Sequence, residues 1–227
     1  MISYRSLLIL CWWWKAMVPR FREKNNRFRI ARPLDNNFEL DERMNYIPPI
    51  QQQRFQKTDR KNIIVQTKEL LLPEFDIEMA NTRKVLERVP DELLNWKPHE
   101  KSSTMMRLAI HVASLPRLAT IALQTDFLDL RSFPPQPSAG SRREILDLFE
   151  TVWGAARSAI IQTTEDGFSL PWSLNNGSVT IFTMPRAAVM RRVMLNHLIH
   201  HRGQLTVYLR LCDIAVPALY GPSADER

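Results

Sequence analysis

Apolar residues recur at three- and four-residue steps through four stretches of the chain, a spacing that places side chains on one face of a helix. These stretches cover approximately residues 65–88, 102–115, 141–163 and 185–211. The stripe of the first comprises Leu72, Phe75, Met79, Thr82, Leu86 and Val89. Four long helices with one apolar stripe each predict an all-α fold, a four-helix bundle.

Capping signals mark where these helices begin and end. Ser102 or Ser103 can cap the second helix, which Pro116 stops. Ser141, followed three residues later by a glutamate, forms a capping box for the third, and Pro185 suits the first turn of the fourth. The inner face of the fourth helix is predicted to contain Met190, Met194, His197, His201, Gln204 or Leu205, Tyr208 and Cys212.

The connections between the later helices are long. Residues 124–140 are rich in proline, and residues 166–183 contain Asn-Asn-Gly between two apolar runs, which predicts a small hairpin or an irregular excursion. Long crossings favour a non-sequential bundle over a simple up-down-up-down one.

Residues 1–62 differ from the rest of the chain. They are rich in Arg, Asn, Gln and Pro without sustained periodicity, which predicts a disordered or loosely attached extension before a domain at 63–227. Residues 1–65 hold 13 Lys and Arg against 6 Asp and Glu, whereas residues 66–227 hold 18 of each. The domain therefore has no net charge to attract a phosphate backbone, and nucleic acid is not an expected partner.

Two further features bear on the compartment. The apolar run at residues 7–14 is too short to span a bilayer, so no membrane partner is expected. Cys11 and Cys212 are too few for a disulfide framework or a cysteine-based zinc motif, which indicates a reducing, cytoplasmic compartment.

Three histidines are the strongest sign of chemistry. His197 and His201 are four residues apart on the fourth helix, and His111 lies on the second. Two facing helices with this set can build a three-nitrogen metal site that leaves positions open for water or a thiolate. Neutral imidazoles suit Zn, Ni, Fe and Cu. His200 is the competing ligand, but it points about 100° away from His201 around the helix axis.

Several polar neighbours have two interpretations each. Asp76 and Glu78 on the first helix either orient a ligating imidazole or form a solvated face. Arg202 and Gln204 either line the site or pack at a helix interface. The remaining candidates for the surroundings of the site are His200 and Tyr208.

Several motifs together resemble the DinB (damage-inducible) family. They are the run Asn-His-Leu-Ile-His-His-Arg-Gly-Gln-Leu at 196–205, Leu-Ala-x-His at 108–111, Trp-Lys-Pro at 96–98, and the C-terminal sequence at 216–226. The resemblance covers residues 66–227. It implies a bundle of up-down-down-up topology with a divalent metal bound by His111, His197 and His201.

The family includes metal-dependent transferases of low-molecular-weight thiols. The resemblance thus predicts a divalent-metal enzyme (Zn, Ni or Fe) of the thiol S-transferase or hydrolase type, acting on a small molecule and forming a homodimer. The alternative is a non-catalytic metal-binding stress-response protein that acts through dimerisation. Binding of nucleic acid through residues 1–65 ranks third.

Overall fold

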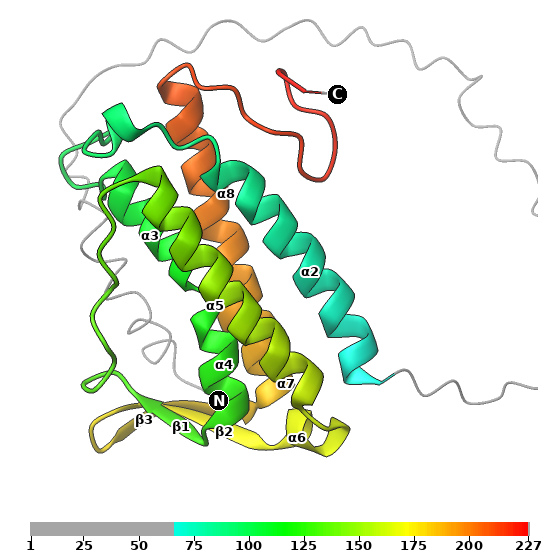
Figure 1. Cartoon of the computed structure of the whole chain (residues 1–227). Helices are drawn as coiled ribbons and strands as arrows, with labels where there is room; N and C mark the ends of the chain where they lie inside the picture. Colours follow the sequence, from blue (N-terminus) through cyan, green and yellow to red (C-terminus); the bar gives the residue numbers. More distant parts are fainter. Residues whose placement is uncertain (1–65, 227) are drawn as a thin grey trace, which may run out of the picture. The chain divides into compact units, whose positions relative to one another are not determined.

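The computed structural model describes residues 66–226, and the predictions made for residues 1–62 and for the domain boundary at 63 lie outside this range. Within it, four long helical segments pack against one another (Figure 1). In chain order they are α2 (Thr67–Leu86), α3 (Met105–Ser114) with α4 (Arg117–Gln124), α5 (Arg142–Gln162), and α7 (Arg186–Val189) with η4 (Met190–Leu195) and α8 (Asn196–Leu211). Two short helices, η3 (Asp91–Leu93) and α6 (Glu165–Ser169), lie in the connections.

The direction and neighbours of each segment follow from the connections. In Figure 1, α2 and α8 run upwards, while α3, α4 and α5 run downwards. Helix α5 contacts α2, α3 and α4, and α8 contacts α2 and α3. Helices α3 and α8 therefore lie side by side, which brings the histidines of the two helices within reach of one another.

The predicted stripe of the first helix forms much of its buried face. Phe75, Met79 and Leu86 are fully buried, as the spacing requires. Leu71 is buried in place of Leu72, which is half-buried at the edge of the core. The helix begins with a capping box between Gln66 and Glu69.

The second helix, α3, ends at Ser114, just before Pro116 as predicted, but the helix that follows it was not predicted. The chain breaks there and then continues as α4 for eight residues. Pro116 is the N-cap of α4, because a proline at the start of a helix needs no hydrogen-bonded N–H. The helix also starts later than predicted, since the Thr104 hydroxyl, rather than Ser102 or Ser103, accepts from the N–H of Arg107.

The stretch Met105–Gln124 is long and apolar enough to cross a membrane by length and composition, and most of it is buried inside the protein. A core helix of a soluble protein passes the same test, so this stretch is weak evidence for a membrane span.

The third helix matches its predicted bounds, with Ser141 as its cap. The N–H of Glu144 donates to the Ser141 hydroxyl at 3.2 Å. The Glu144 carboxylate accepts from the N–H of Gly140, one residue before the position that a capping box requires.

The fourth helix contains a π-helical segment, η4, which changes its buried face. A π-helix closes its hydrogen bonds over five residues instead of four, so each turn holds more residues. The buried stripe of Met190 and Met194 continues through Leu198, Arg202, Leu205, Tyr208 and Leu209. Leu205 and Tyr208 were predicted, whereas Leu198 and Arg202 take the buried positions expected of His197 and His201. His197 and His201 lie at the edge of this face and are only half-buried.

A small sheet corrects the all-α prediction. It contains β1 (Phe127–Asp129), β2 (Pro171–Asn176) and β3 (Val179–Pro185) in that order, with β1 parallel to β2 and β2 antiparallel to β3. The hairpin of β2 and β3 was one of the two forms expected there, and Gly177 turns it at φ 65°. Strand β1 is three residues long, too short for an alternating pattern to show in the sequence.

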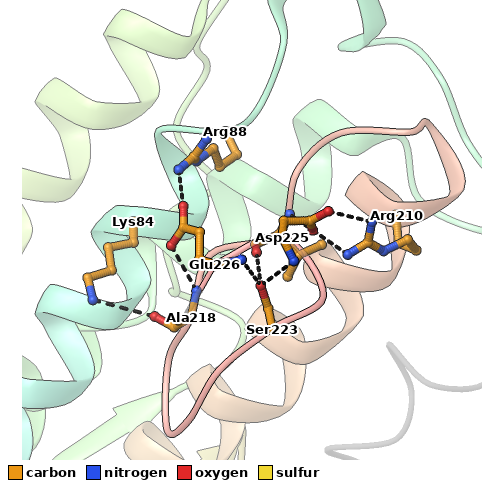
Figure 2. A network of polar contacts seen from close by, with 8 residues as sticks. Lys84, Arg88, Arg210, Ala218, Ser223, Asp225 and Glu226 are labelled. Carbon is orange, nitrogen blue, oxygen red and sulfur yellow. Dashed lines mark hydrogen bonds and ion pairs between the residues drawn. The ribbon is translucent and has the colours of Figure 1, made fainter.

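The segment after α8, residues 212–226, folds back onto the helices. We call it the C-terminal clasp. Figure 2 shows its polar contacts, in which Asp225 pairs with Arg210 and Glu226 pairs with Arg88. The Asp225 carboxylate also accepts from the N–H of Val216 at 2.8 Å. The clasp thereby joins the end of α8 to the end of α2.

Candidate metal centre

The structure brings three histidines from two neighbouring helices together. His111 lies in the last turn of α3, and His197 and His201 lie one turn apart on α8. Helix α8 is regular from Asn196 onwards, so the two α8 imidazoles share one side of the helix. Contact between α3 and α8 places His111 opposite them.

The imidazole rings of the three histidines lie close enough together to bind one ion. One ring nitrogen of each histidine lies within 4.8 Å of the other two. The Nε2 atoms of His111 and His197 are 3.4 Å apart. Two nitrogens bound to one tetrahedral zinc at about 2.0–2.1 Å are roughly 3.3 Å apart. These three residues could therefore hold a metal ion without a rearrangement of the helices.

Burial keeps the three imidazoles neutral. The pKa of His111 is lowered from 6.5 to about 3, mainly by burial and in part by the neighbouring His201, His197, Arg107 and Arg117. Burial likewise lowers the pKa of His197 to about 4, and it lowers that of His201. Neutral imidazole is the form that binds a metal, so the site is ready for a cation at neutral pH.

Gln204 fixes the orientation of one imidazole. Its side-chain oxygen lies 2.7 Å from Nδ1 of His201. An amide oxygen can only accept, so this contact assigns the proton to Nδ1 and leaves the Nε2 lone pair of His201 available for a ligand. Hydrogen bonds of this kind orient ligating histidines in metal proteins.

His200 lies outside the group of three. Its side chain is exposed, although its ring lies 4.9 Å from the ring of His201. The exposure follows from its position, since it is about 100° around the helix from His201.

Glu78 and Arg202 are bound to each other rather than to a histidine. Arg202 is buried and donates to the Glu78 carboxylate at 2.6 Å, to its backbone oxygen at 2.9 Å and to the Thr82 hydroxyl at 3.1 Å. The hydroxyl of Tyr220 donates to the same carboxylate at 2.8 Å. The residues form a buried polar link between α2, α8 and the C-terminal clasp, as the interface interpretation of Arg202 predicted.

Asp76 and Tyr208 also have partners away from the histidines. Asp76 forms a bidentate ion pair with Arg157 of α5. The Tyr208 hydroxyl donates to the backbone oxygen of Ser103 at 3.3 Å, and its ring packs edge-on against Trp96. These contacts join helices and loops around the site.

Sequence reasoning missed two residues near this region, Tyr220 and Arg117. Tyr220 belongs to a C-terminal motif whose partner, Glu78, lies 142 residues earlier. Arg117 follows the helix break at Pro116, and no periodic pattern places it near His111. The only signal was the charge itself, on a helix otherwise almost entirely apolar.

Together these features define a predominantly helical protein with three half-buried histidines gathered from two adjacent helices. The DinB family model matches residues 59–227, so the chain belongs to the DinB family. This confirms the resemblance that the motifs suggested.

The chain is also similar to individual proteins. The uncharacterized protein YrdA of Bacillus subtilis (strain 168) is 28% identical over 171 residues, which are 71% of this chain and 92% of that protein. A crystal structure of a DinB-like protein from Bacillus cereus ATCC 10987 is similar with a TM-score of 0.53 and 24% identity, covering 66% of this chain and 95% of that one. The DinB-like protein YjoA of Bacillus subtilis has a TM-score of 0.53 and 17% identity, covering 66% and 96%. At these identities the two structures show the fold alone.

Proposed function

We propose that this protein binds a divalent metal ion through His111, His197 and His201. The observation that carries the proposal is the 3.4 Å separation of the His111 and His197 Nε2 atoms, with a His201 nitrogen close to both. Three half-buried, neutral imidazoles with no acidic ligand among them suit Zn, Ni or Fe better than Mg or Ca.

We further propose that the bound metal makes the protein an enzyme of the thiol S-transferase or hydrolase type, acting on a small molecule. A metal held by three histidines stabilises a thiolate, or lowers the pKa of a bound water, at its open positions. The protein's own contribution is to keep the three imidazoles neutral and to orient His201 through Gln204.

The proposal includes the wider arrangement of the chain. The directions of α2, α3 with α4, α5 and α8 in Figure 1 support a four-helix bundle of up-down-down-up order. We also propose a cytoplasmic location, because the sequence has few cysteines, and no role in binding nucleic acid, because residues 66–227 have no net charge.

Metal content of the purified protein tests the first step. Inductively coupled plasma mass spectrometry should find close to one equivalent of a transition metal in the wild-type protein, and His111→Ala with His197→Ala should abolish it. A screen of the metal-loaded protein for conjugation of small thiols to electrophiles then tests the second step. Stoichiometric metal without any thiol or hydrolase turnover would favour the non-catalytic alternative.

We also propose a homodimer, which both candidate functions include. Four large apolar side chains are exposed on the adjacent helices α2 and α8, namely Leu70, Ile77, Val207 and Leu211. A contiguous apolar patch marks a protein interface, and the proposal is that these side chains of α2 and α8 form one. Sedimentation equilibrium of the wild type and of Val207→Glu tests it, since a dimer formed there should dissociate in the variant.

A further inference from the structure

Helices α3 and α8 run side by side in opposite directions, and their line of contact extends beyond the three histidines (Figure 1). We call this line the α3–α8 seam. Two contacts show which turns face each other. The rings of His111 and His201 lie 4.6 Å apart, and Tyr208, further along α8, donates to the backbone oxygen of Ser103, just before α3. The turn of α3 that precedes His111 therefore faces the turn of α8 that follows His201.

Gln204 presents a carboxamide at this turn of α8. Its side-chain oxygen lies 2.7 Å from Nδ1 of His201, which fixes one end of the amide beside the histidine. Its Nε2 group has no hydrogen-bond partner among residues 66–226 and is not enclosed by protein, since the residue is only half-buried. An Nε2 group carries two N–H donors and can only donate. This end of Gln204 can therefore bind an oxygen atom of a molecule at the histidines.

A second carboxamide reaches the facing turn of α3 from the loop between β1 and α5. The Nε2 group of Gln136 donates to the backbone oxygen of Arg107 at 2.8 Å. In a regular helix that oxygen also accepts from the N–H of His111, four residues later. Helical side chains lean towards the N-terminus, so the imidazole of His111 covers the same turn. The amide of Gln136 is thereby placed beside the histidines, across the α3–α8 seam from Gln204.

Gln136 is oriented by its own contact and by the loop that carries it. A carbonyl can only accept, so the contact with α3 uses Nε2 and leaves the side-chain oxygen of Gln136 directed away from that carbonyl. This oxygen has no partner within the described part of the chain and is not enclosed. Prolines 134, 135 and 137 restrict the backbone on both sides, and Ala139 is buried in the core. The loop therefore holds an accessible hydrogen-bond acceptor at a defined place.

We propose that Gln136 and Gln204 together bind a neutral carboxamide group of the small molecule that occupies the histidine site. This inference rests on the proposed function and deepens it by naming the substrate class, a small amide-bearing molecule. The Nε2 group of Gln204 donates to the carbonyl oxygen of that amide, and the side-chain oxygen of Gln136 accepts from its N–H.

The spacing and the charge of the two glutamines suit such a group. Adjacent helices pack roughly 8–10 Å apart, which leaves room for one small group between two hydrogen bonds of about 2.9 Å each. Both recognising atoms are uncharged, so they satisfy a neutral group that donates and accepts, and they offer no ion pair to a carboxylate or a phosphate. An ester has the carbonyl oxygen but lacks the N–H, and it should lose the contact with Gln136.

The test uses the full chain and two matched glutamine variants. Gln136→Met keeps the length of the side chain and removes both polar ends of the amide. Gln162→Met is the control, because it makes the same change at an exposed glutamine at the end of α5. Both variants should melt within about 2 °C of the wild type if Gln136 serves a bound molecule rather than the fold.

The first measurement needs no metal. Nuclear magnetic resonance follows the assigned side-chain amide signals of the metal-free wild type while N-methylacetamide is added. The signals of Gln136 and Gln204 should shift together and saturate, and that of Gln162 should shift much less. Methyl acetate, which lacks the N–H, should shift only the Gln204 signal. Equal shifts at Gln136 and Gln162 would overturn the inference, and so would equal responses of Gln136 to the amide and the ester.

The second measurement uses Co²⁺ as a spectroscopic probe of thiols at the histidines. N-acetylcysteamine and 2-mercaptoethyl acetate differ only in that the amide N–H of the first is an oxygen in the second. Visible absorption of the Co²⁺-loaded wild type and of Gln162→Met should show the amide thiol binding about 3- to 10-fold more tightly, the range of one neutral hydrogen bond. Gln136→Met should lose this preference.

The outcomes separate the role of the glutamines from that of the metal. A preference for the amide thiol that persists in Gln136→Met would overturn the inference, and so would a large loss of melting temperature in that variant with unchanged binding of the amide thiol. If Gln136→Met does not fold, the signals of Gln136 and Gln162 in the wild type decide the question. Failure of Co²⁺ to bind would refute the proposed function alone, because the metal-free titrations still decide the role of the two glutamines.

Discussion

Replacing Arg202 by methionine should destabilise the protein by about 3–5 kcal/mol, the usual cost of removing one partner from a buried ion pair. The side chains of Arg202 and Glu78 are 1% and 7% exposed, so neither charge can recover its hydration when the other is lost. Methionine fills a similar volume, which limits any cavity and isolates the loss of the charge.

The structure allows this cost to be expressed as a melting temperature. Unfolding entropy of about 2.1 cal/mol/K per residue, over the roughly 160 described residues, gives about 0.34 kcal/mol per degree. A loss of 3–5 kcal/mol therefore lowers the midpoint of thermal unfolding by roughly 9–15 °C. Differential scanning calorimetry of the metal-free protein measures it directly.

Arg157→Met is the matched control, since it breaks an ion pair of similar geometry in a different environment. Arg157 binds Asp76 at 2.9 Å, but the side chains are 45% and 34% exposed. Exposed pairs contribute about 0–1 kcal/mol, so this variant should melt within about 3 °C of the wild type.

A double variant checks the mechanism. Adding Glu78→Met to Arg202→Met removes the stranded carboxylate and should restore much of the lost stability. If Arg202→Met alone melted like Arg157→Met and bound metal more weakly, Arg202 would line the metal site, and the network with Glu78 and Tyr220 would be refuted.

Three further predictions concern the site and the C-terminal clasp. His201→Ala should weaken metal binding by more than the 10–100-fold that is typical of a change outside the ligands, whereas His200→Ala should weaken it only mildly. Titrations with chelator-buffered metal measure both affinities, and the reverse order would contradict the ligand set. The folded-state pKa values of His111 and His197 lie near 3 and 4, so below pH 6.5 the unfolded metal-free chain binds more protons than the folded one. The free energy of unfolding, measured in urea, should therefore fall by about 2 kcal/mol per histidine between neutral pH and pH 5. A His111→Gln variant should show a shallower pH dependence, and an unchanged slope would refute this. Asp225→Ala should lower the melting temperature by roughly 2–4 °C, since it removes a carboxylate that binds both an arginine and a backbone amide; an unchanged melt would show that the clasp adds no stability.

The sequence predicted those parts of the fold that depend on local periodicity. The bounds of the first and third helices hold within two residues, because caps and apolar stripes are set by neighbours one turn away. The continuation of the second helix as α4 could not be read in this way. Proline ends most helices, and only the packing of α4 against α5 shows that the chain resumes a helix after Pro116.

The partners of the polar residues were harder to predict than the histidines. Glu78 sits on a helix where a solvated acid is the ordinary expectation, yet it is buried because Arg202 and Tyr220 reach it from distant parts of the chain. No spacing along one helix encodes such a contact. Which side chains pair across the fold depends on how the helices and the C-terminal clasp pack together, and one sequence alone does not predict these contacts.

The histidine site could be predicted even though the buried face of the helix that presents it was predicted only in part. The π-helical segment ends at Leu195, before His197, so the pair at 197 and 201 lies in regular α-helix and keeps its mutual spacing. What the π-segment changes is the direction in which the pair points relative to Met190 and Met194. It moves the histidines from the centre of the buried face to its edge, beside α3, where burial still keeps them neutral. In an uninterrupted α-helix His197 would lie on nearly the same side as Met190, two turns earlier, whereas the extra residue in the π-helical turn puts Leu198 there, which accounts for the half-buried position of the histidines.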